Sequence, residues 1–295
     1  MAENVLKLKS YAKVNLYLKI GHRTGDGYHN IESIMQTIDL FDEINLKQTD
    51  RPGIFIECDN PEVPTDKNSI IYKAAEILMN NINKGINISI KKHIPVASGL
   101  GGGSSNVATV LKGICRIFNL PLSPARLLNI ATNFGMDTPF FILGGTAFAR
   151  GRGELVSPLP SIYPPIPLIL INPEIKVSTK WAYQLYDKSI DKNVKSIADF
   201  SYLLNRSEII KPVEIYSLIY NSFDLILSQK FPVIEKIKNR LKKLGSITAT
   251  ISGSGPTIYG IFERKNDMVR VYNEIKDEYP LVYQAYTIGA QDTSS

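Results

Sequence analysis

The segment IPVASGLGGGSSN, residues 94–106, is typical of a loop between two regular elements and decides how the rest of the chain is interpreted. Four of the five residues from Gly99 to Gly103 are glycine, which has no side chain to bury and loses the most backbone entropy on ordering. Such a run instead offers a row of unobstructed backbone N–H groups. We therefore expect this loop to form a binding site.

The residues after the loop predict a helix. Apolar residues from Val107 to Phe118 recur at the spacing of one helical face, and Ser104 and Ser105 are expected to cap its start. Amides that converge on a helix N-terminus bind anions, most often phosphate. The sequence therefore predicts a phosphate-binding loop. The alternative, a flexible turn, would need neither so many glycines nor a capped helix behind it.

Two well-known phosphate-binding motifs do not describe this loop. A Walker A loop has Lys and then Ser or Thr after its last glycine, whereas Gly103 is followed by Ser104, Ser105 and Asn106. The dinucleotide fingerprint would require glycine at position 104. Other segments must therefore identify the loop.

Composition and charge indicate an ordinary globular chain. Its 295 residues suffice for one large or two ordinary domains, with 44% hydrophobic and 21% charged residues. The net charge of +6 suits a solvated surface that attracts anionic small molecules. A dense Arg/Lys arm for nucleic acid is absent from the sequence. We expect small-molecule substrates, no nucleic-acid partner, and a monomer or homodimer.

The cysteines and histidines predict neither a disulfide framework nor a metal site. Cys58 and Cys115 are far apart, and His22, His29 and His93 lack the spacing of metal ligands. The start of the chain has no apolar run like that of a signal peptide, and no later stretch reaches spanning length. We therefore expect a cytoplasmic protein without a membrane contact, and assign no metal ligand.

An alternating segment near the N-terminus predicts a strand with one buried face. Ala12, Val14 and Leu16 would point into the core, while Lys13 and Asn15 share the opposite, polar face. From this pattern alone, Lys13 is most simply a solvated surface residue.

Strands and helices alternate along the rest of the chain, and hairpin-like segments near its start favour an α+β fold over a doubly wound sheet. Prolines concentrated over residues 158–167 predict a boundary between domains 1–160 and 161–295. In the second domain, residues 209–227 are expected to be mostly helical. A second glycine-containing loop, SGSGP at residues 252–256, precedes a predicted strand.

Three segments together resemble the GHMP kinases, the galacto-, homoserine, mevalonate and phosphomevalonate kinase superfamily. They are AKVNL at 12–16, the loop at 95–106, and SGSGPT at 252–257. Further segments look like the members of that family that phosphorylate 4-diphosphocytidyl-2-C-methyl-D-erythritol. These are GDGYH at 25–29, GLGGGSSN at 99–106, DTPF at 137–140 and GTAFA at 145–149. The resemblance covers nearly the whole chain and is weakest over residues 187–230.

The resemblance implies a two-domain α+β fold. Its N-terminal, ATP-binding domain would resemble the second domain of ribosomal protein S5, and its C-terminal domain would be ferredoxin-like. The implied reaction is ATP-dependent phosphorylation of the substrate's 2-hydroxyl, giving ADP and the 2-phosphate, in non-mevalonate isoprenoid precursor biosynthesis. Mg²⁺ is expected as the counterion of ATP.

The resemblance also implies the catalytic residues. Phosphoryl transfer to an alcohol needs an acceptor for the hydroxyl proton, and the family match assigns this role to Asp137. Lys13 would be its partner, since a nearby ammonium keeps a carboxylate ionised. From the residues alone, Asp137 could instead cap the turn that begins at Thr138.

The substrate residues implied by the resemblance come from four places in the chain. Tyr28 would stack on cytosine, His29 would hydrogen-bond its polar edge, and Tyr183 would stack from the other side, with Trp181 as the alternative. Asn15 would help to place the substrate. Gly253, Ser254 and Gly255 would close over its phosphates or the nucleotide.

The residues implied for ATP lie in and around the first glycine loop. The backbone amides of residues 100–105 would hold the phosphates, and Asn68 and Lys92 would border adenine. The full set is Asn68, Lys92, Pro95, Leu100, Gly101, Gly102, Gly103, Ser104, Ser105 and Asn106.

Two other functions remain open at this point. One is a GHMP kinase acting on a small alcohol without a nucleotide, against which Tyr28 and His29 argue. The other is a non-catalytic, S5-like RNA-binding protein, which would bind RNA in a salt-sensitive way and have no use for Asp137 or the second glycine loop.

Overall fold

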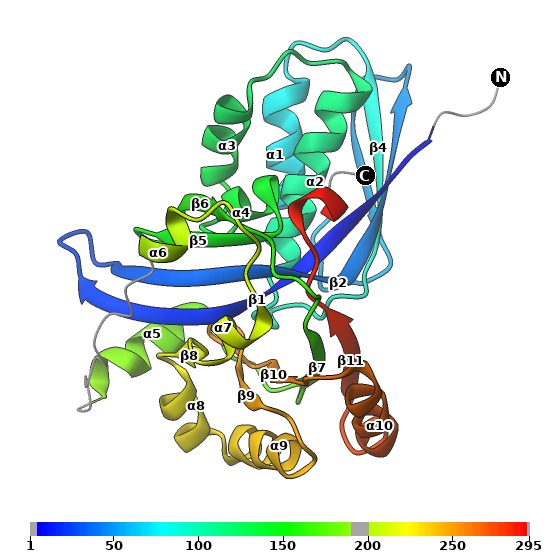
Figure 1. Cartoon of the computed structure of the whole chain (residues 1–295). Coiled ribbons are helices and arrows are strands. Elements are labelled where there is room, and N and C mark those ends of the chain that lie inside the picture. Colours follow the sequence, from blue (N-terminus) through cyan, green and yellow to red (C-terminus); the bar gives the residue numbers. More distant parts are fainter. Residues whose placement is uncertain (1–4, 190–200, 294–295) are drawn as a thin grey trace.

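The computed structural model describes residues 5–189 and 201–293 of the chain. Within them, helices and strands are arranged around two β-sheets (Figure 1), which confirms the predicted α+β class. In this part of the chain, no helix combines the length and apolar character needed to cross a membrane. Residues 1–4, which begin the stretch inspected for a signal peptide, lie outside the described residues.

A long antiparallel hairpin of β1 (Val5–Arg23) and β2 (His29–Thr49) crosses the molecule (Figure 1). It forms the centre of a seven-stranded sheet with the order β3-β4-β2-β1-β8, and β5 and β6 extend from β2. The other strands of this sheet are β3 (Gly53–Cys58), β4 (Gly85–Lys91), β5 (Thr146–Arg150), β6 (Leu155–Leu159) and β8 (Tyr220–Asn221).

Four helices accompany this first sheet: α1 (Ile70–Met79), α2 (Gly102–Ile117), α3 (Pro124–Thr132) and α4 (Thr138–Leu143). Residues of α1 and α2, such as Ile71 and Val110, share a buried cluster with Ile44 and Ile88 of the sheet. The start of α3 is capped by Ser123, whose hydroxyl accepts a hydrogen bond from the backbone of the third following residue at 3.3 Å.

The second sheet is antiparallel, with the order β11-β7-β10-β9. Its strands are β7 (Pro167–Asn172), β9 (Thr248–Ile251), β10 (Ile258–Ile261) and β11 (Leu281–Tyr286). The helices that accompany it are α5 (Thr179–Lys188), α7 (Pro212–Tyr216), α8 (Asp224–Lys230), α9 (Pro232–Lys243) and α10 (Lys265–Ile275). The short helix α6 (Ser201–Leu204) contacts β6 of the first sheet, and the short helix η1 (Ala290–Thr293) packs against the glycines between α4 and β5. The chain passes from the first sheet to the second between Leu159 and Pro167.

The prediction that residues 209–227 are mostly helical is wrong in the middle of that range. Between α7 and α8 the chain becomes the short strand β8, which pairs in parallel with β1 through Tyr220 and Asn221. The Asn221 side-chain amide also donates to the carbonyls of Ile251 (3.0 Å) and Gly253 (2.9 Å). The spacing of apolar residues carries no information about hydrogen-bond partners that are distant in sequence. Here those partners decide the conformation.

The prediction that β1 has only one buried face is also wrong. Lys13 and Asn15 are only 3% and 2% exposed, as deeply buried as Val14 on the other face. The reason is that other parts of the chain cover the polar face. The Lys13 amide donates to the carbonyl of Leu100 at 3.0 Å, and the Lys13 side chain is in contact with the residue before α4.

Candidate active site

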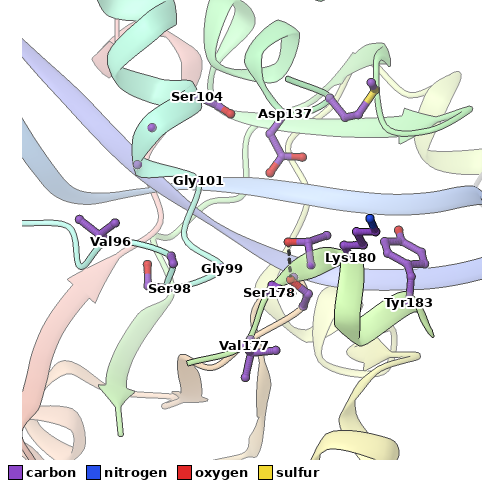
Figure 2. Close-up of a pocket in the computed structure, with 18 of the residues that line it drawn as sticks. Val96, Ser98, Gly99, Gly101, Ser104, Asp137, Val177, Ser178, Lys180 and Tyr183 are labelled. Carbon is purple, nitrogen blue, oxygen red and sulfur yellow. Dashed lines mark hydrogen bonds between the residues drawn. The ribbon is translucent and has the colours of Figure 1, made fainter. Parts of the chain in front are cut away.

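A cleft of about 1110 Å³ lies between the first glycine loop and α5, and its walls come from both halves of the chain. In Figure 2, Gly99, Gly101 and Ser104 lie on one side, and Lys180 and Tyr183 of α5 on the other. The walls bring together residues of β1, the β1–β2 turn, both glycine loops and the segment just before α4. These segments are far apart in sequence, so the tertiary fold assembles this site.

The first glycine loop leads directly into α2. The helix begins at Gly102, and its N-cap is Gly101 in the left-handed conformation (φ +73°), without a side-chain cap hydrogen bond. The expectation that Ser104 and Ser105 cap the helix is therefore wrong, since both lie inside its first turns. The missing side-chain cap favours anion binding, because no capping side chain competes for the first amides of α2 at the cleft wall.

A buried carboxylate fixes the start of this loop. Asp42 Oδ1 accepts hydrogen bonds from the backbone amides of His93 and Ile94, both at 2.8 Å. Its Oδ2 accepts from Asn106 Nδ2 at 2.8 Å and contacts Lys92 Nζ. Asp42 is fully buried, so four donors compensate the loss of water around its charge. This network ties β2 to the residues that follow β4 and to α2.

The two glycine loops touch. Ser252 Oγ donates to the Gly99 carbonyl at 2.9 Å, and the Thr257 amide donates to the Ser98 carbonyl at 3.2 Å. Gly99 has φ +80°, and a Cβ atom there would lie 2.3 Å from the carbonyl oxygen of Ser252. The close approach therefore requires glycine, and it joins the two halves of the chain at the floor of the cleft.

The centre of the cleft holds an ion pair. Lys13 Nζ lies 3.3 Å from Asp137 Oδ2; the Lys13 side chain is 4% exposed and the Asp137 side chain 30%. Asp137 precedes α4, but its side chain makes no capping hydrogen bond. The capping alternative that the residues alone left open is therefore wrong, and the carboxylate faces the cleft (Figure 2).

Hydrogen bonds extend from Lys13 to fix its orientation. Lys13 Nζ donates to Asn15 Oδ1 at 2.5 Å, Asn15 Nδ2 donates to Ser33 Oγ at 2.8 Å, and Ser33 Oγ donates to the carbonyl of Tyr17 at 2.7 Å. A Cβ atom on Gly253 would lie 3.3 Å from Lys13 Nζ. The second glycine loop therefore approaches the same ammonium, which lies between both loops.

An irregularity in the β1–β2 pairing accompanies the orientation of Lys13. On the N-terminal side of this irregularity, even-numbered residues of β1 such as Leu8 and Ser10 contact α2. After the register shift between Tyr11 and Ala12, the even-numbered residues join the core shared with the second sheet, and Lys13 lies beside Gly101 at the start of α2. Bulges commonly redirect side chains next to active sites in this way.

The aromatic end of the cleft contains His29 and Tyr183. Their rings stack with centroids 5.5 Å apart and an interplanar angle of 19°. Burial, with smaller contributions from Asp137 and Tyr186, raises the pKa of Tyr183 to about 12, so its phenol stays neutral. His29 Nε2 lies 2.9 Å from Asp187 Oδ1 and Nδ1 lies 3.0 Å from the Gly21 carbonyl. A hydrogen bond from this ring to a bound base would replace one of these contacts.

Tyr28 lies at the same end but is 53% exposed, and it lines the cleft together with His29 and Tyr183. Trp181, the alternative to Tyr183, is not among the lining residues; its ring packs against Phe231 with centroids 5.8 Å apart. Between these two aromatic residues, only Tyr183 is therefore placed to meet a ligand.

Most residues expected to bind ATP also reach the cleft. Those in its walls are Asn68, Lys92, Pro95, Gly101, Gly102, Gly103, Ser104 and Asn106, whereas Leu100 and Ser105 are not. Leu100 is fully buried, and the Ser105 hydroxyl accepts a hydrogen bond from Ser10 at 2.8 Å. The substrate residues Asn15, Gly253, Ser254 and Gly255 line the cleft as well.

Sequence analysis missed four residues that shape this site: Asp42, Arg152, Asp187 and Asn221. The sequence did not single out Asp42, because Asp39 and Glu43 lie close to it along the chain. The other three act through partners distant in sequence. In the described residues, no group of three or more His, Cys, Asp and Glu side chains is arranged to hold a metal ion.

Comparisons with known proteins agree with this geometry. A model described as the GHMP kinases N terminal domain matches residues 69–145, and one described as GHMP kinases C terminal matches residues 206–281. The 4-diphosphocytidyl-2-C-methyl-D-erythritol kinase of Caldanaerobacter subterraneus subsp. tengcongensis is 39% identical over 285 residues, covering 96% of this chain and 97% of that protein. Its counterpart in Geobacter metallireducens is 40% identical over 265 residues, covering 89% and 91%.

A solved structure shows the same likeness. The crystal structure of a 4-(cytidine 5'-diphospho)-2C-methyl-D-erythritol kinase superposes on this chain with a TM-score of 0.77 and 26% sequence identity. The match covers 96% of this chain and 100% of the other.

Proposed function

This chain belongs to the 4-diphosphocytidyl-2-C-methyl-D-erythritol kinases of the GHMP kinase family, and we propose that it transfers the γ-phosphoryl group of ATP to the 2-hydroxyl of that substrate. The products would be ADP and the 2-phosphate, in non-mevalonate isoprenoid precursor biosynthesis. The observation that carries the proposal is the pair of Lys13 and Asp137, which faces the cleft next to an uncapped helix N-terminus.

In the proposed reaction, Asp137 accepts the proton of the substrate hydroxyl while the hydroxyl oxygen attacks the γ-phosphorus. The bond between that phosphorus and the bridging oxygen of ADP breaks, and ADP leaves with the bonding electron pair. Lys13, 3.3 Å from the Asp137 carboxylate, favours its ionised form and supplies positive charge near the transferred group. The hydrogen bond to Asn15 keeps the Lys13 ammonium in place.

ATP would bind with its phosphates at the start of α2. The uncapped amides from Gly102 onward and the absence of side chains at the loop glycines fit a phosphate chain. Lys92 faces this end of the cleft, while its ammonium is held by Asp42 and Asn106. Mg²⁺ would enter bound to the phosphate oxygens as MgATP and neutralise part of their charge.

The cytidine end of the substrate would occupy the aromatic end of the cleft. The base would stack on Tyr28 with its polar edge toward His29, and Tyr183 would complete the opposite wall. Gly253, Ser254 and Gly255 would approach the diphosphate, which keeps the substrate alcohol near Asp137. This arrangement gives the substrate its nucleotide handle at one end and the reacting hydroxyl at the other.

The test measures ADP release by the purified full-length protein with MgATP and a panel of alcohols. We expect turnover with 4-diphosphocytidyl-2-C-methyl-D-erythritol and no comparable turnover with mevalonate, homoserine or galactose. Phosphorus NMR of the product should show a new monophosphate ester at the 2-position. Turnover of mevalonate or homoserine instead of the cytidyl compound would overturn the proposal.

A further inference from the structure

An arginine covers one face of the exposed tyrosine at the aromatic end of the cleft. The guanidinium carbon of Arg152 lies 4.3 Å from the centroid of the Tyr28 ring, within the range of a cation–π contact. Arg152 Nη2 also contacts Asp26 Oδ2, and Arg152 and Tyr28 both line the cleft. The three side chains form a layered group, in which Asp26 holds Arg152 and Arg152 covers Tyr28.

Both partners are presented by structured turns. On the Tyr28 side, Asp26 Oδ1 accepts from Thr24 Oγ1 at 2.5 Å and from the Tyr28 amide at 3.1 Å, while the Thr24 amide donates to the Tyr28 carbonyl at 2.7 Å. These bonds fix the backbone at Tyr28 but leave its ring 53% exposed. The ring orientation therefore depends on what packs against its faces.

The Arg152 side of the contact is fixed by the turn between β5 and β6. The Arg152 amide donates to Glu154 Oε2 at 2.7 Å, and the Gly151 carbonyl accepts from the Ile31 amide at 2.7 Å. The second bond joins this turn to β2, two residues beyond His29. These two bonds fix the backbone at Arg152 relative to β2, and the contact with Asp26 holds its guanidinium beside Tyr28.

We propose that Arg152 is a positioning residue for substrate recognition, which orders the Tyr28 ring so that its other face is ready to stack on the pyrimidine. This inference rests on the proposed function, because it assumes that a cytidine-linked substrate occupies this end of the cleft. A planar guanidinium can cover an aromatic face while it bonds a carboxylate, which the compact ammonium of lysine does not do equally well. Ordering the ring before binding removes part of the entropy cost of ordering it upon binding.

The expected effect is on substrate affinity and not on chemistry. Losing an exposed cation–π contact should raise the KM for the cytidyl substrate by about two- to fivefold. The value of kcat and the KM for ATP should stay close to those of the parent protein, since the Arg152 guanidinium contacts Tyr28 and Asp26 and neither Lys13 nor Asp137.

The experiment compares Arg152→Ala, Arg152→Lys and Asp26→Ala with a matched control, Arg150→Ala. Arg150 is also an arginine next to an aromatic ring, 5.7 Å from the Phe148 centroid, but it is exposed and outside the cleft walls. Steady-state kinetics with both substrates should show a raised KM for the cytidyl compound in the three test variants and parental constants in Arg150→Ala. The KM of Arg152→Lys for the cytidyl compound should lie closer to that of Arg152→Ala than to that of the parent.

A direct binding measurement separates this inference from the proposed function. Calorimetric titration with cytidine 5'-diphosphate should give a weaker Kd for Arg152→Ala than for the parent, by the same factor as the KM change. If the parent turns over the cytidyl substrate but Arg152→Ala leaves both its KM and this Kd unchanged, the role of Arg152 is refuted. If the parent neither binds nor turns over cytidyl compounds, the proposed function itself fails.

Discussion

The ammonium of Lys13 lies 3.3 Å from the carboxylate of Asp137, although the two residues belong to a strand at the start of the chain and to the segment before α4. Lys13 is buried and hydrogen-bonded to Asn15, whereas Asp137 is partly exposed to the cleft. A fixed cation therefore supports a carboxylate that a ligand can reach. This arrangement is consistent with the role of base that we propose for Asp137.

Replacing the base should abolish most turnover without comparable loss of binding. Asp137→Asn keeps the size of the side chain but removes its ability to accept a proton, and we expect kcat to fall by about 10²- to 10⁴-fold. The Kd for ATP should change by less than about threefold, because the phosphates bind at the helix N-terminus. The measurements are coupled ADP release and calorimetric titration of the nucleotide.

The matched control for this variant is Asp277→Asn, since Asp277 is exposed and lies outside the cleft walls. It should keep parental kinetics. Activity of Asp137→Asn within a few-fold of the parent would remove Asp137 as the base.

The buried Asp42 should matter for stability because it compensates a buried cation. Asp42→Asn leaves the Lys92 ammonium, whose side chain is 6% exposed, without its carboxylate. Breaking a buried ion pair from one side costs about 3–5 kcal/mol, so the free energy of unfolding should fall by this order. Urea denaturation followed by circular dichroism measures the change.

Two further variants make this prediction specific. Glu43→Gln alters the neighbouring, exposed carboxylate that contacts Lys91 and His93, and it should leave the stability near that of the parent. The double variant of Asp42→Asn with Lys92→Met removes both buried charges and should recover part of the loss. Equal instability of the single and double variants would contradict a charge-based role for Asp42.

The contact between the glycine loops should make position 99 intolerant of any side chain. Gly99→Ala places a Cβ atom 2.3 Å from the Ser252 carbonyl oxygen in a backbone conformation that disfavours L side chains, so the two loops must separate. We expect a lower Tm and loss of turnover. Gly103→Ala is the control for stability, because its Cβ atom would meet only Ile70 Cδ1, at 3.7 Å, inside a helix. A Gly99→Ala protein with parental Tm and activity would show that the loops need not touch.

The buried carboxyl group of Asp39 predicts how the stability of the protein depends on pH. Burial raises the pKa of Asp39 and outweighs the hydrogen bond that its carboxylate accepts from the Tyr286 amide at 2.7 Å. The folded state therefore holds this proton more tightly than the unfolded state, so the stability from Asp39 is full below its ordinary pKa and is lost as pH rises through the raised value. The Tm of Asp39→Asn relative to the parent should be higher at pH 7 than at pH 4.

Asp50 provides the comparison of opposite sign. A hydrogen bond from Lys84 lowers the pKa of this exposed carboxyl, so its contribution is present above its ordinary pKa and is lost as pH falls. The Tm of Asp50→Asn relative to the parent should therefore be lower at pH 7 than at pH 4. An identical pH trend for the two variants would refute the assignment for Asp39.

Local patterns in the sequence were sufficient for several features of this protein. The glycine run and the apolar spacing after it predicted a loop that leads into a helix, which the structure shows as α2, and the alternation near the N-terminus predicted β1. These features follow from backbone freedom and periodicity, which act over a few residues. The family resemblance extended them to a fold and to a set of candidate residues.

The tertiary structure alone decided which residues meet. Lys13 has the position of a solvated residue on an alternating strand, yet the glycine loop and the segment before α4 bury it beside Asp137. Asp42 and Arg152 gain their roles only through partners far along the chain. The physical reason is that burial and charge pairing depend on distances in space. Local periodicity identifies a strand and its two faces, but it does not determine which distant segments will cover them.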